Sequence, residues 1–332
     1  MILTLTPNPT IDRVIFCRNF RLGDVVRAER ELVIPSGKGV DASLVLHELG
    51  AETRVLGLRA GLNGRLHADL LDRWGIAHDM VPAEGETRSA IVLVDRSVDQ
   101  QSTISAPTLT AGEAQLEGLM EGVRRHAGRA WGLICGGSLP PGLPADSYAR
   151  LLRKARACGL VTLLDSSRNA LRHGVEGVPD VLKINLRELG ALMQGEDGRA
   201  GGPLPHTLDE EALDANGLRD LARVLAGYLG RWARQAIAIT VGARGTLAAT
   251  TEGCWRVRPP SVPAVNTAGA GDALDAGLML ARSQGQPWPA ALALGTAAAA
   301  SVVMNEGTAI CRREEVYELL AQVLVEPLTK DE

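Results

Sequence analysis

The chain has 332 residues, of which 45% are hydrophobic, and its formal net charge at pH 7 is -4. This length can bury the core of one large domain. The 35 Lys and Arg residues are scattered rather than grouped, so the charge pattern does not support a nucleic acid or a membrane surface as a partner. The five cysteines form an odd set without a C-x-x-C pair, which argues against a disulfide framework and against a zinc site.

Two stretches bear on localisation, and neither carries a targeting or membrane signal. The opening residues, MILTLTPNPTIDRVIF, lack the basic segment and the small-residue cleavage site of a signal peptide. The weakly polar run at residues 292–304 is shorter than the roughly 20 residues of a membrane span, and its small residues suit a close-packed helix. We therefore expect a cytoplasmic protein.

Short apolar runs of strand length alternate with longer segments of helical period along most of the chain. The expected strands are Met1–Leu5, Thr53–Gly57, Leu133–Gly136, Val161–Asp165, Val181–Ile184 and Ile237–Thr240. The expected helices are Val40–Leu49, Arg65–Trp74, Ala111–Ala127, Pro144–Ala157, Leu186–Met193 and Gly217–Arg234. This alternation predicts an α/β fold with a doubly wound, mainly parallel sheet that helices cover on both faces.

Two stretches, residues 11–35 and 87–106, break this rhythm because they are strand-like and contain no helix. In the second stretch polar and apolar residues alternate, as in Arg88–Asp95. Such segments predict a small β lid that protrudes from the main body and is exposed on one face. We expect residues 1–332 to form a single domain with these lid segments inserted, and a long surface loop at residues 195–216.

The segment NTAGAGDALDAG combines a glycine-rich turn with the start of a helix. The backbone N–H groups of Gly269, Ala270 and Gly271 and the positive end of the helix dipole then converge on one place, which makes an anion site. Asp272, in the first turn, can accept a proton from an attacking hydroxyl beside that site. The alternative is an ordinary helix with an acidic first turn. The segment does not match the dinucleotide-binding pattern G-x-G-x-x-G.

A second glycine-rich turn, PSGKGVDAS, also leads into a helix. Gly37, Lys38, Gly39 and Asp41 offer backbone donors, a cation and a carboxylate to a polyhydroxy ligand. An ordinary strand-to-helix turn explains the same residues. Asp12 follows the first strand, where a residue of a surface turn is the usual interpretation.

Seven segments, taken in their order along the chain, resemble the PfkB or ribokinase-like family of carbohydrate kinases. The resemblance covers nearly the whole chain and is closest to the branch of phosphofructokinases and tagatose-phosphate kinases. Its segments are TPNPTID, GKGVDAS, GETRSAIV, GGSLPPGLP, LKINLREL, TVGARG and NTAGAGD.

The resemblance implies a ribokinase-like fold with a β lid, in which ATP lies over the carboxyl ends of the strands. It implies that Asp272 is the catalytic base and that Gly269, Ala270 and Gly271 form the anion hole for the transferring phosphoryl group. It also assigns a set of residues to the nucleotide, namely Lys183, Asn185, Glu188, Thr240, Gly242, Gly245 and Thr267. No side chain is expected to bind a metal directly, because Mg²⁺ arrives with ATP and is held through water near Asn185 and Glu188.

The resemblance also implies contacts to the acceptor. Asp12 and the turn Gly37–Gly39 match sugar contacts, whereas Lys38, Arg88 and Arg27 match the cations that hold a phosphate already on the sugar. The chain departs from the family pattern at two positions, where Ser36 replaces a glycine and Asp41 replaces an asparagine.

An ionised Asp41 adds a negative charge near the acceptor and can only accept hydrogen bonds. If Lys38 neutralises it, we expect a preference for a sugar other than fructose phosphates. If it is not neutralised, a neutral polyol becomes the natural ligand.

We therefore expect an ATP-dependent kinase that phosphorylates a hydroxyl of a ketohexose monophosphate, such as fructose 1-phosphate, fructose 6-phosphate or tagatose 6-phosphate. Two alternatives stay open at this point. One is a kinase of an unphosphorylated sugar or polyol, and the other is a sugar-phosphate sensor without catalytic activity. Edge pairing of the lid strands also favours a homodimer.

Overall fold

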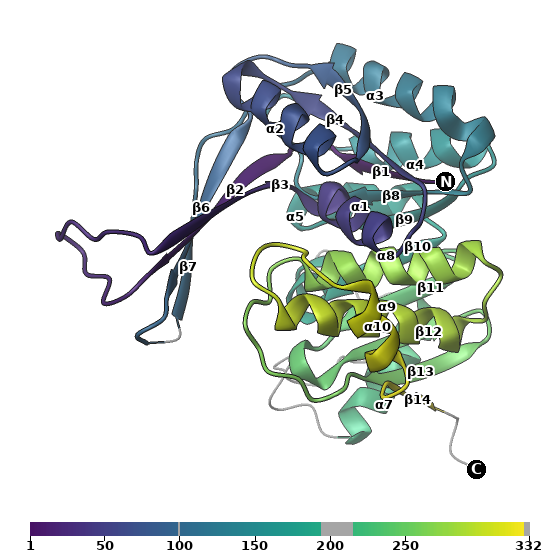
Figure 1. Ribbon diagram of the computed structural model, residues 1–332. Helices are drawn as coiled ribbons and strands as arrows, with labels where there is room; N and C mark the ends of the chain where they lie inside the picture. The colour runs from purple at the N-terminus through teal and green to yellow at the C-terminus, as the bar shows by residue number, and fades with distance from the viewer. Residues whose placement is uncertain (99, 194–214, 329–332) are drawn as a thin grey trace.

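The computed structural model describes residues 1–98, 100–193 and 215–328 (Figure 1). Within these residues the strands are β1 (Ile2–Thr6), β2 (Thr10–Cys17), β3 (Arg30–Ser36), β4 (Thr53–Arg59), β5 (Ala77–Pro82), β6 (Arg88–Asp95), β7 (Gln100–Ser105), β8 (Gly132–Gly136), β9 (Val161–Asp165), β10 (Val181–Asn185), β11 (Ala236–Thr240), β12 (Thr246–Thr250), β13 (Gly253–Arg258) and β14 (Leu324–Pro327). They form a ten-stranded sheet in the order β14-β13-β12-β11-β10-β9-β8-β1-β4-β5 and a four-stranded sheet in the order β3-β2-β6-β7.

Helices cover both faces of the large sheet (Figure 1). They are α1 (Lys38–Glu48), α2 (Gly61–Arg73), α3 (Glu113–His126), α4 (Ser147–Ala157), α5 (Arg168–Gly174), α6 (Leu186–Met193), α7 (Ala215–Gly227), α8 (Ala270–Ser283), α9 (Trp288–Met304) and α10 (Arg313–Leu320), with short 3-10 turns η1 (Ala127–Arg129), η2 (Val175–Gly177) and η3 (Gly242–Arg244). Apolar side chains of α3 to α7 pack in one core cluster, and those of α1, α8, α9 and α10 pack in another. The predicted doubly wound architecture is therefore confirmed.

The central strands are apolar because both of their faces are buried. All residues of β1 and β8 are buried, and so are most residues of β9, β10 and β11. Every strand pair from β5 to β11 in the sheet order is parallel, whereas β12, β13 and β14 continue the sheet antiparallel. The carboxyl ends of the parallel strands therefore meet along one edge, which is where open α/β sheets bind their ligands.

Helices α8 and α9 pack at very short range. A Cβ added to Gly277 of α8 would lie 2.7 Å from the Cα of Gly295 in α9, so the two backbones touch. Small residues over 292–304 allow this approach, as the sequence predicts. The packing fixes α8, whose first turn carries Asp272.

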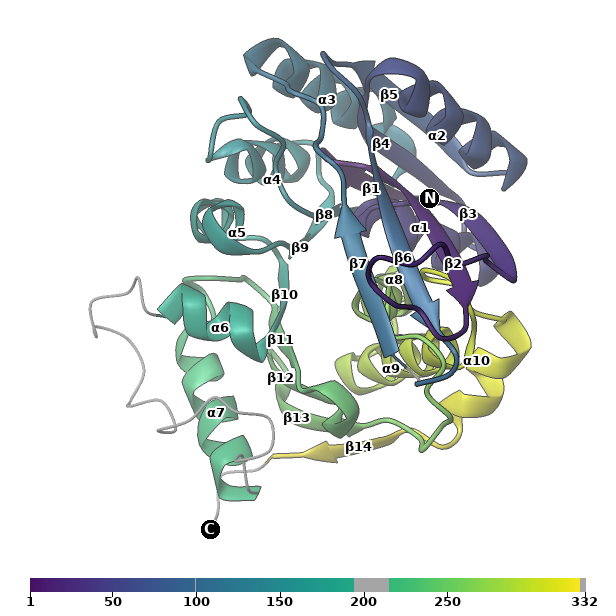
Figure 2. The same cartoon turned by 90° about the vertical axis from the view of Figure 1, so that its left-hand side faces the viewer.

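The small sheet projects from the main body, to the left in Figure 1, and faces the viewer in Figure 2. One of its faces packs on α1 and α2, where Val14, Ile34 and Val92 join a buried cluster. The other face exposes side chains such as Ile91 and Ile104. The predicted lid with one exposed face is therefore present. Glu306, which lies between α9 and α10 in the main body, forms ion pairs with two arginines of the lid segments, Arg30 and Arg96.

The structure differs from the sequence prediction at one helix end and in several strands, and one predicted loop is not tested. The helix predicted to reach Arg234 ends at Gly227, and the chain turns at Gly230, whose φ of 85° is left-handed. Strands β5, β12, β13 and β14 are not predicted. Strands β5, β13 and β14 are partly exposed, whereas β12 is buried along its whole length. Most of the predicted loop at residues 195–216 lies outside the described residues. No helix among the described residues is long and apolar enough to cross a membrane.

Candidate active site

Two helix N-termini meet at the carboxyl edge of the parallel strands. Helix α1 begins directly after β3, and the backbone N–H of Val40 in its first turn donates to the Thr6 hydroxyl at the end of β1. Helix α8 begins at Ala270, and Nζ of Lys38 in α1 lies 3.9 Å from Oδ1 of Asp272 in α8. The positive ends of two helix dipoles and a lysine therefore converge, which makes this edge favourable for anions.

The turn before α8 requires glycine at Gly269. Its φ is 86°, in the left-handed region, and an added Cβ would lie only 2.5 Å from the backbone nitrogen of Ala309. Asn266 holds the same turn, because its side chain accepts from the N–H of Ala268 and donates to the carbonyl of Gly307. Gly269, Ala270 and Gly271 thus form the N-terminal end of α8, where the sequence places them.

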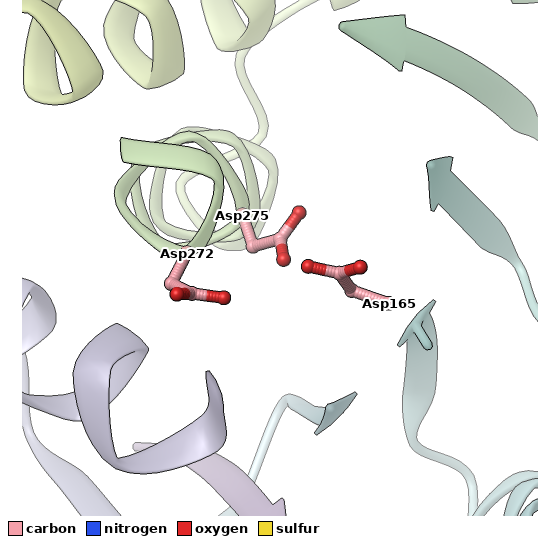
Figure 3. Close-up of side chains that lie close together, drawn as sticks. All are labelled: Asp165, Asp272 and Asp275. Atoms are coloured by element: carbon pink, nitrogen blue, oxygen red, sulfur yellow. The ribbon is translucent and has the colours of Figure 1, made fainter. Parts of the chain in front are cut away.

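Three buried carboxylates lie together beside this helix end (Figure 3). Asp165 ends β9, whereas Asp272 and Asp275 come from the first two turns of α8, and each offers an oxygen within 4.8 Å of the others. Lys183 of β10 pairs with Asp165 and with Asp275, the latter at 3.6 Å. Lys38 donates to Oδ2 of Asp165 at 2.7 Å. Two ammonium groups therefore already supply the positive charge that a metal ion would bring to this cluster.

The charges within this cluster set the protonation of its acids. Burial alone would raise the pKa of Asp165, but the charges of Lys183 and Lys38 lower that pKa to about 2. Burial raises the pKa of Asp272, with a further contribution from the negative charge of Asp165, while Lys38 works in the opposite direction. Burial likewise raises the pKa of Asp275 well above its usual value. Asp165 is thus the fixed anion, and Asp272 is a more basic carboxylate than an exposed aspartate.

Asp272 keeps one oxygen available. Its side chain is buried, but Oδ1 has no hydrogen-bond partner among the described residues. A buried polar atom without a partner is costly, so such an atom indicates a site for an external donor. A carboxylate with a raised pKa and a free oxygen at a helix N-terminus can accept a proton from a bound hydroxyl.

Asp12 and Asp41 form the next part of the site, on the side toward the lid. Oδ2 of Asp12 accepts from the Thr308 hydroxyl at 2.8 Å, and Oδ2 of Asp41 accepts from the Ser36 hydroxyl at 3.2 Å. Burial is the main cause that raises the pKa of each acid. Asp12 is thus a buried residue of β2 rather than a residue of a surface turn.

Arg88 lies at the start of β6, opposite Thr10 of β2. Its guanidinium donates to the Ser105 hydroxyl at 3.1 Å and to the backbone carbonyl of Asn8 at 3.5 Å. The side chain of Asn8 in turn donates to the Ser138 hydroxyl at 3.0 Å. A cation and several hydroxyl and amide groups thus line the base of the lid.

A cavity of about 810 Å³ lies beside the N-terminus of α8. Several of the residues expected at the nucleotide line it, namely Asn185, Thr240, Gly242, Gly245 and Thr267. Ala270 and Gly271 join the same wall. Thr296 also lines the cavity, and its buried hydroxyl has no hydrogen-bond partner among the described residues, so it is available to a ligand.

Lys183 and Glu188 do not line this cavity. Lys183 is buried with Asp165 and Asp275, as described above. Glu188 forms a reciprocal pair with Asn185 at the start of α6: each side chain accepts from the other residue's backbone N–H at 2.9 Å. Burial, followed by the charge of Asp165, raises the pKa of Glu188.

Two of the expected cations lie apart from the lid-side pocket. Lys38 pairs with Asp165 and Asp272, so its charge is placed at the α8 N-terminus rather than beside Arg88. Arg27 lies in the exposed loop 18–29 that joins β2 to β3, at the end of the small sheet remote from the large one (Figure 1). The structure brings together most of the other expected site residues along one edge.

Comparison with known proteins decides the family. Residues 7–315 match the family described as pfkB family carbohydrate kinase. The chain belongs to this family. This carbohydrate kinase is 28% identical to the ATP-dependent 6-phosphofructokinase isozyme 2 of Mycobacterium tuberculosis, over 97% of the kinase and 90% of that relative. It is also 28% identical to the 1-phosphofructokinase of Escherichia coli K12, with 98% of each chain covered.

Solved structures show the same fold for this kinase. Phosphofructokinase-2 from Escherichia coli, solved in complex with substrates and products, superposes with a TM-score of 0.84 at 23% identity, covering 97% of the kinase and 98% of that chain. A possible 1-phosphofructokinase from Thermotoga maritima superposes with a TM-score of 0.82 at 24% identity, covering 98% and 99%. The ribokinase-like expectation for the fold is confirmed.

Sequence reasoning misses Asp165 and Asp275. Asp275 lies three residues after Asp272 on the same helix, and this spacing places both side chains on one face. Asp165 ends a predicted parallel strand, which is a position that faces the ligand edge. Both signals are visible in the sequence, but the pairing of Lys183 with both acids depends on how β9, β10 and α8 pack.

Proposed function

We propose that the protein transfers the γ-phosphate of ATP to a hydroxyl of a ketohexose monophosphate. The observation that carries this proposal is the free buried oxygen of Asp272. It lies in the first turn of α8, next to Ala270 and Gly271, which line the 810 Å³ cavity. The names of the relatives, 1-phosphofructokinase and 6-phosphofructokinase isozyme 2, support an acceptor of this class.

In this proposal the acceptor hydroxyl gives its proton to Oδ1 of Asp272. The raised pKa of Asp272 suits this role because it makes the carboxylate a stronger base while leaving it ionised above that pKa. The N–H groups of Gly269 and Gly271 are proposed to neutralise the charge that develops on the transferred group, and Lys38 adds a positive charge from α1. The N–H of Ala270, which the sequence also places in this anion site, instead donates to the Thr267 carbonyl at 3.3 Å. Asp165 and Lys183 hold Lys38 and α8 in place through their ion pairs.

The residues present fit ATP and Mg²⁺. The cavity has polar groups at Asn185, Thr240 and Thr267, an unpartnered hydroxyl at Thr296, and a helix N-terminus at one end. When bound, ATP supplies the transferable phosphoryl group, and Mg²⁺ neutralises part of its charge. Asn185 and Glu188 provide the oxygen atoms that Mg²⁺ prefers, and they are proposed to hold it through water.

Arg88 is proposed to hold the phosphate that the acceptor already carries. Its charge lies at the base of the lid beside Ser105 and Asn8, where a bidentate guanidinium can bind a phosphate. Asp12 and the turn Gly37–Gly39 are proposed to contact the sugar between this phosphate and Asp272. Arg27 can join them only if its loop moves or if a second chain supplies it.

A coupled assay of ADP release tests the proposal. Fructose 1-phosphate, fructose 6-phosphate and tagatose 6-phosphate are compared with fructose, tagatose and glycerol at equal concentration. We expect at least one ketohexose monophosphate to give the highest specificity constant. A higher specificity constant for an unphosphorylated sugar would mean that the protein is a sugar or polyol kinase. The absence of ADP release with every acceptor would mean that it is a binding protein without catalytic activity.

We also propose a homodimer formed through the exposed face of the small sheet. Ile104 on this face is 66% exposed, and Leu22 and Val25 in the adjoining loop are more than nine-tenths exposed. Such an apolar surface on a projecting sheet favours association with a second copy. Sedimentation equilibrium of the wild type and of the Ile104→Lys variant tests this, since the variant is expected to sediment as a monomer and a monomeric wild type contradicts the proposal.

A further inference from the structure

Asp41 is a buried acid near Asp12, Arg88 and Asp272. It lies in the first turn of α1 and is only 4% exposed. One carboxyl oxygen, Oδ2, accepts a hydrogen bond from the Ser36 hydroxyl at 3.2 Å. The other oxygen, Oδ1, is buried and has no hydrogen-bond partner among the described residues. A buried polar atom without a hydrogen-bond partner indicates a ligand that supplies the missing hydrogen bond.

No ion pair among the described residues compensates a negative charge on Asp41. Lys38, three residues earlier, is engaged by Asp165 and Asp272. Arg88 contributes some positive potential, but its guanidinium donates hydrogen bonds to Ser105 and Asn8. Within the described residues, no ion pair includes Asp41. An isolated buried carboxylate is far less stable than its neutral form, so such a group takes up a proton.

Burial and the acids around Asp41 favour its neutral form. Those that face it are Asp272 of α8, Asp12 of β2 and Arg88 of β6, while His67 of α2 faces the Ser36 carbonyl at 3.4 Å. Burial first, and then the charges of Asp272 and Asp12, raise the pKa of Asp41 well above its usual value, although hydrogen bonds from Ser36 and the Gly37 backbone oppose them. Burial lowers the pKa of His67 to about 4, so its imidazole is neutral at pH 7 and supplies no counter-charge.

The Ser36 hydroxyl, which also hydrogen-bonds Asp12, lies 3.2 Å from Oδ2 of Asp41. When this hydroxyl donates to Oδ2, that oxygen is the carbonyl acceptor of the neutral acid and the acidic O–H is on Oδ1, the oxygen without a partner among the described residues. Ser36 and Asp41 are therefore one feature, joined by this hydrogen bond. Together they present a donor on Oδ1 and hold the other oxygen as an acceptor.

We propose that Asp41 acts as a neutral carboxylic acid whose O–H donates a hydrogen bond to an oxygen of the acceptor sugar, and that it is a specificity-determining residue of this kinase. The proposal rests on the proposed function, because it assigns the acceptor to the pocket between Arg88 and Asp272. It also differs from both possibilities raised by the sequence, which are an ionised Asp41 neutralised by Lys38 and an ionised Asp41 without a partner. A neutral acid neither repels a sugar phosphate nor needs Lys38 as a partner.

Infrared difference spectroscopy tests the protonation state without any activity. The full chain is labelled with ¹³C at aspartate carboxyl groups, and the spectrum of Asp41→Asn is subtracted from that of the wild type at pH 7. We expect the lost band to be the carbonyl stretch of a protonated acid. A lost band of an ionised carboxylate would overturn the proposal, whichever substrate the enzyme uses. Asp69→Asn, an exposed acid on α2, is the matched control and should lose only a carboxylate band.

Kinetics with the acceptor panel test the specificity role. Asp41→Ala should lower the specificity constant for the preferred sugar phosphate by about tenfold, the effect of one lost hydrogen bond. Asp41→Asn should recover most of this loss, because its amide also donates from one atom and accepts at the other. Equal values for all three proteins across the panel would remove Asp41 from the acceptor site. A Michaelis constant in Asp41→Asn well below that of the wild type would mean that a repelling charge had been removed, which contradicts a neutral acid.

The two proposals can fail separately. Absence of ADP release with every acceptor refutes the proposed function, while the infrared result still decides the state of Asp41. Isothermal titration calorimetry then measures the binding of fructose 6-phosphate to the wild type and to Asp41→Ala. The comparison decides whether this acid contacts the sugar. An unchanged dissociation constant would overturn that contact.

Discussion

Nζ of Lys38 lies 3.9 Å from Oδ1 of Asp272, and this contact joins the first turns of α1 and α8. The two helices carry the two glycine-rich segments of the sequence, which are separated by more than two hundred residues. Their contact places a positive charge beside the proposed base, at the helix end whose residues Ala270 and Gly271 line the 810 Å³ cavity. The first two predictions concern this pair.

Asp272→Asn should lower kcat by a factor of about 100 or more, because the acceptor hydroxyl loses its proton acceptor. The amide has nearly the same shape, so the fold and the Michaelis constant for ATP should change little. Steady-state kinetics and a thermal melt measure these effects. Asp69→Asn is the matched control, and near wild-type kcat in a folded Asp272→Asn would remove this residue from the mechanism.

Lys38→Met should move the acid limb of the pH–kcat profile to higher pH. Asp272 must be ionised to act as the base, so activity falls as the pH drops through its pKa. Lys38 lowers this pKa, and its removal therefore raises it. We also expect kcat to fall by about tenfold to a hundredfold, the scale for losing one charge-stabilising group. An unshifted acid limb would show that Lys38 does not act on the base.

Arg88→Ala should raise the Michaelis constant for the sugar phosphate by about tenfold or more while leaving that for ATP within about twofold. The reason is that Arg88 lies at the base of the lid, apart from the nucleotide cavity. Arg13→Ala, on neighbouring β2, is the control because Arg13 pairs with Glu31. Equal effects of Arg88→Ala on both substrates would contradict a role in holding the acceptor's phosphate.

Asp165→Asn should destabilise the protein by about 3–5 kcal/mol, because it leaves Lys38 and Lys183 without their shared anion. The pKa of Asp165 is depressed in the folded state, so its stabilisation is present above the usual value of 3.8 and is lost as the pH falls toward about 2. The difference between wild type and variant in urea unfolding should therefore shrink across this range. A difference that is constant with pH would indicate a packing effect instead.

Gly277→Ala should destabilise the protein by about 1–3 kcal/mol, because the new methyl would lie 2.7 Å from the backbone of Gly295. Gly128→Ala is the control, since a Cβ there meets nothing within 4 Å. Thermal melts of the two variants compare them directly. Equal melting temperatures would mean that α8 and α9 do not pack at this distance.

Much of the fold follows from the sequence because the buried parallel strands are continuous apolar runs. Runs such as Val161–Asp165 need no tertiary information to be recognised. Partly exposed edge strands such as β5 and β14 carry no such signal, so they are missed. The alternation in Arg88–Asp95 predicts the exposed face of the lid, since Ala90 and Val92 point inward and Ile91 outward.

A site residue is predictable from the sequence only where its own short segment shows both its position in the fold and its chemical role. Asp272 follows a glycine-rich turn within a few residues, and so its place at a helix N-terminus can be inferred. The neutral state of Asp41 cannot, because it depends on burial and on Asp12 and Asp272, which are distant in sequence. The same holds for Lys38, whose partner Asp165 lies 127 residues away.

The most direct test of the central claim is to identify the product. Wild-type enzyme is incubated with ATP, Mg²⁺ and each ketohexose monophosphate, and the mixture is analysed by mass spectrometry alongside the amount of ADP formed. We expect a sugar bisphosphate in one-to-one ratio with ADP, and its loss in Asp272→Asn. Formation of ADP without a bisphosphate, or bisphosphate formation that survives unchanged in Asp272→Asn, would contradict the account.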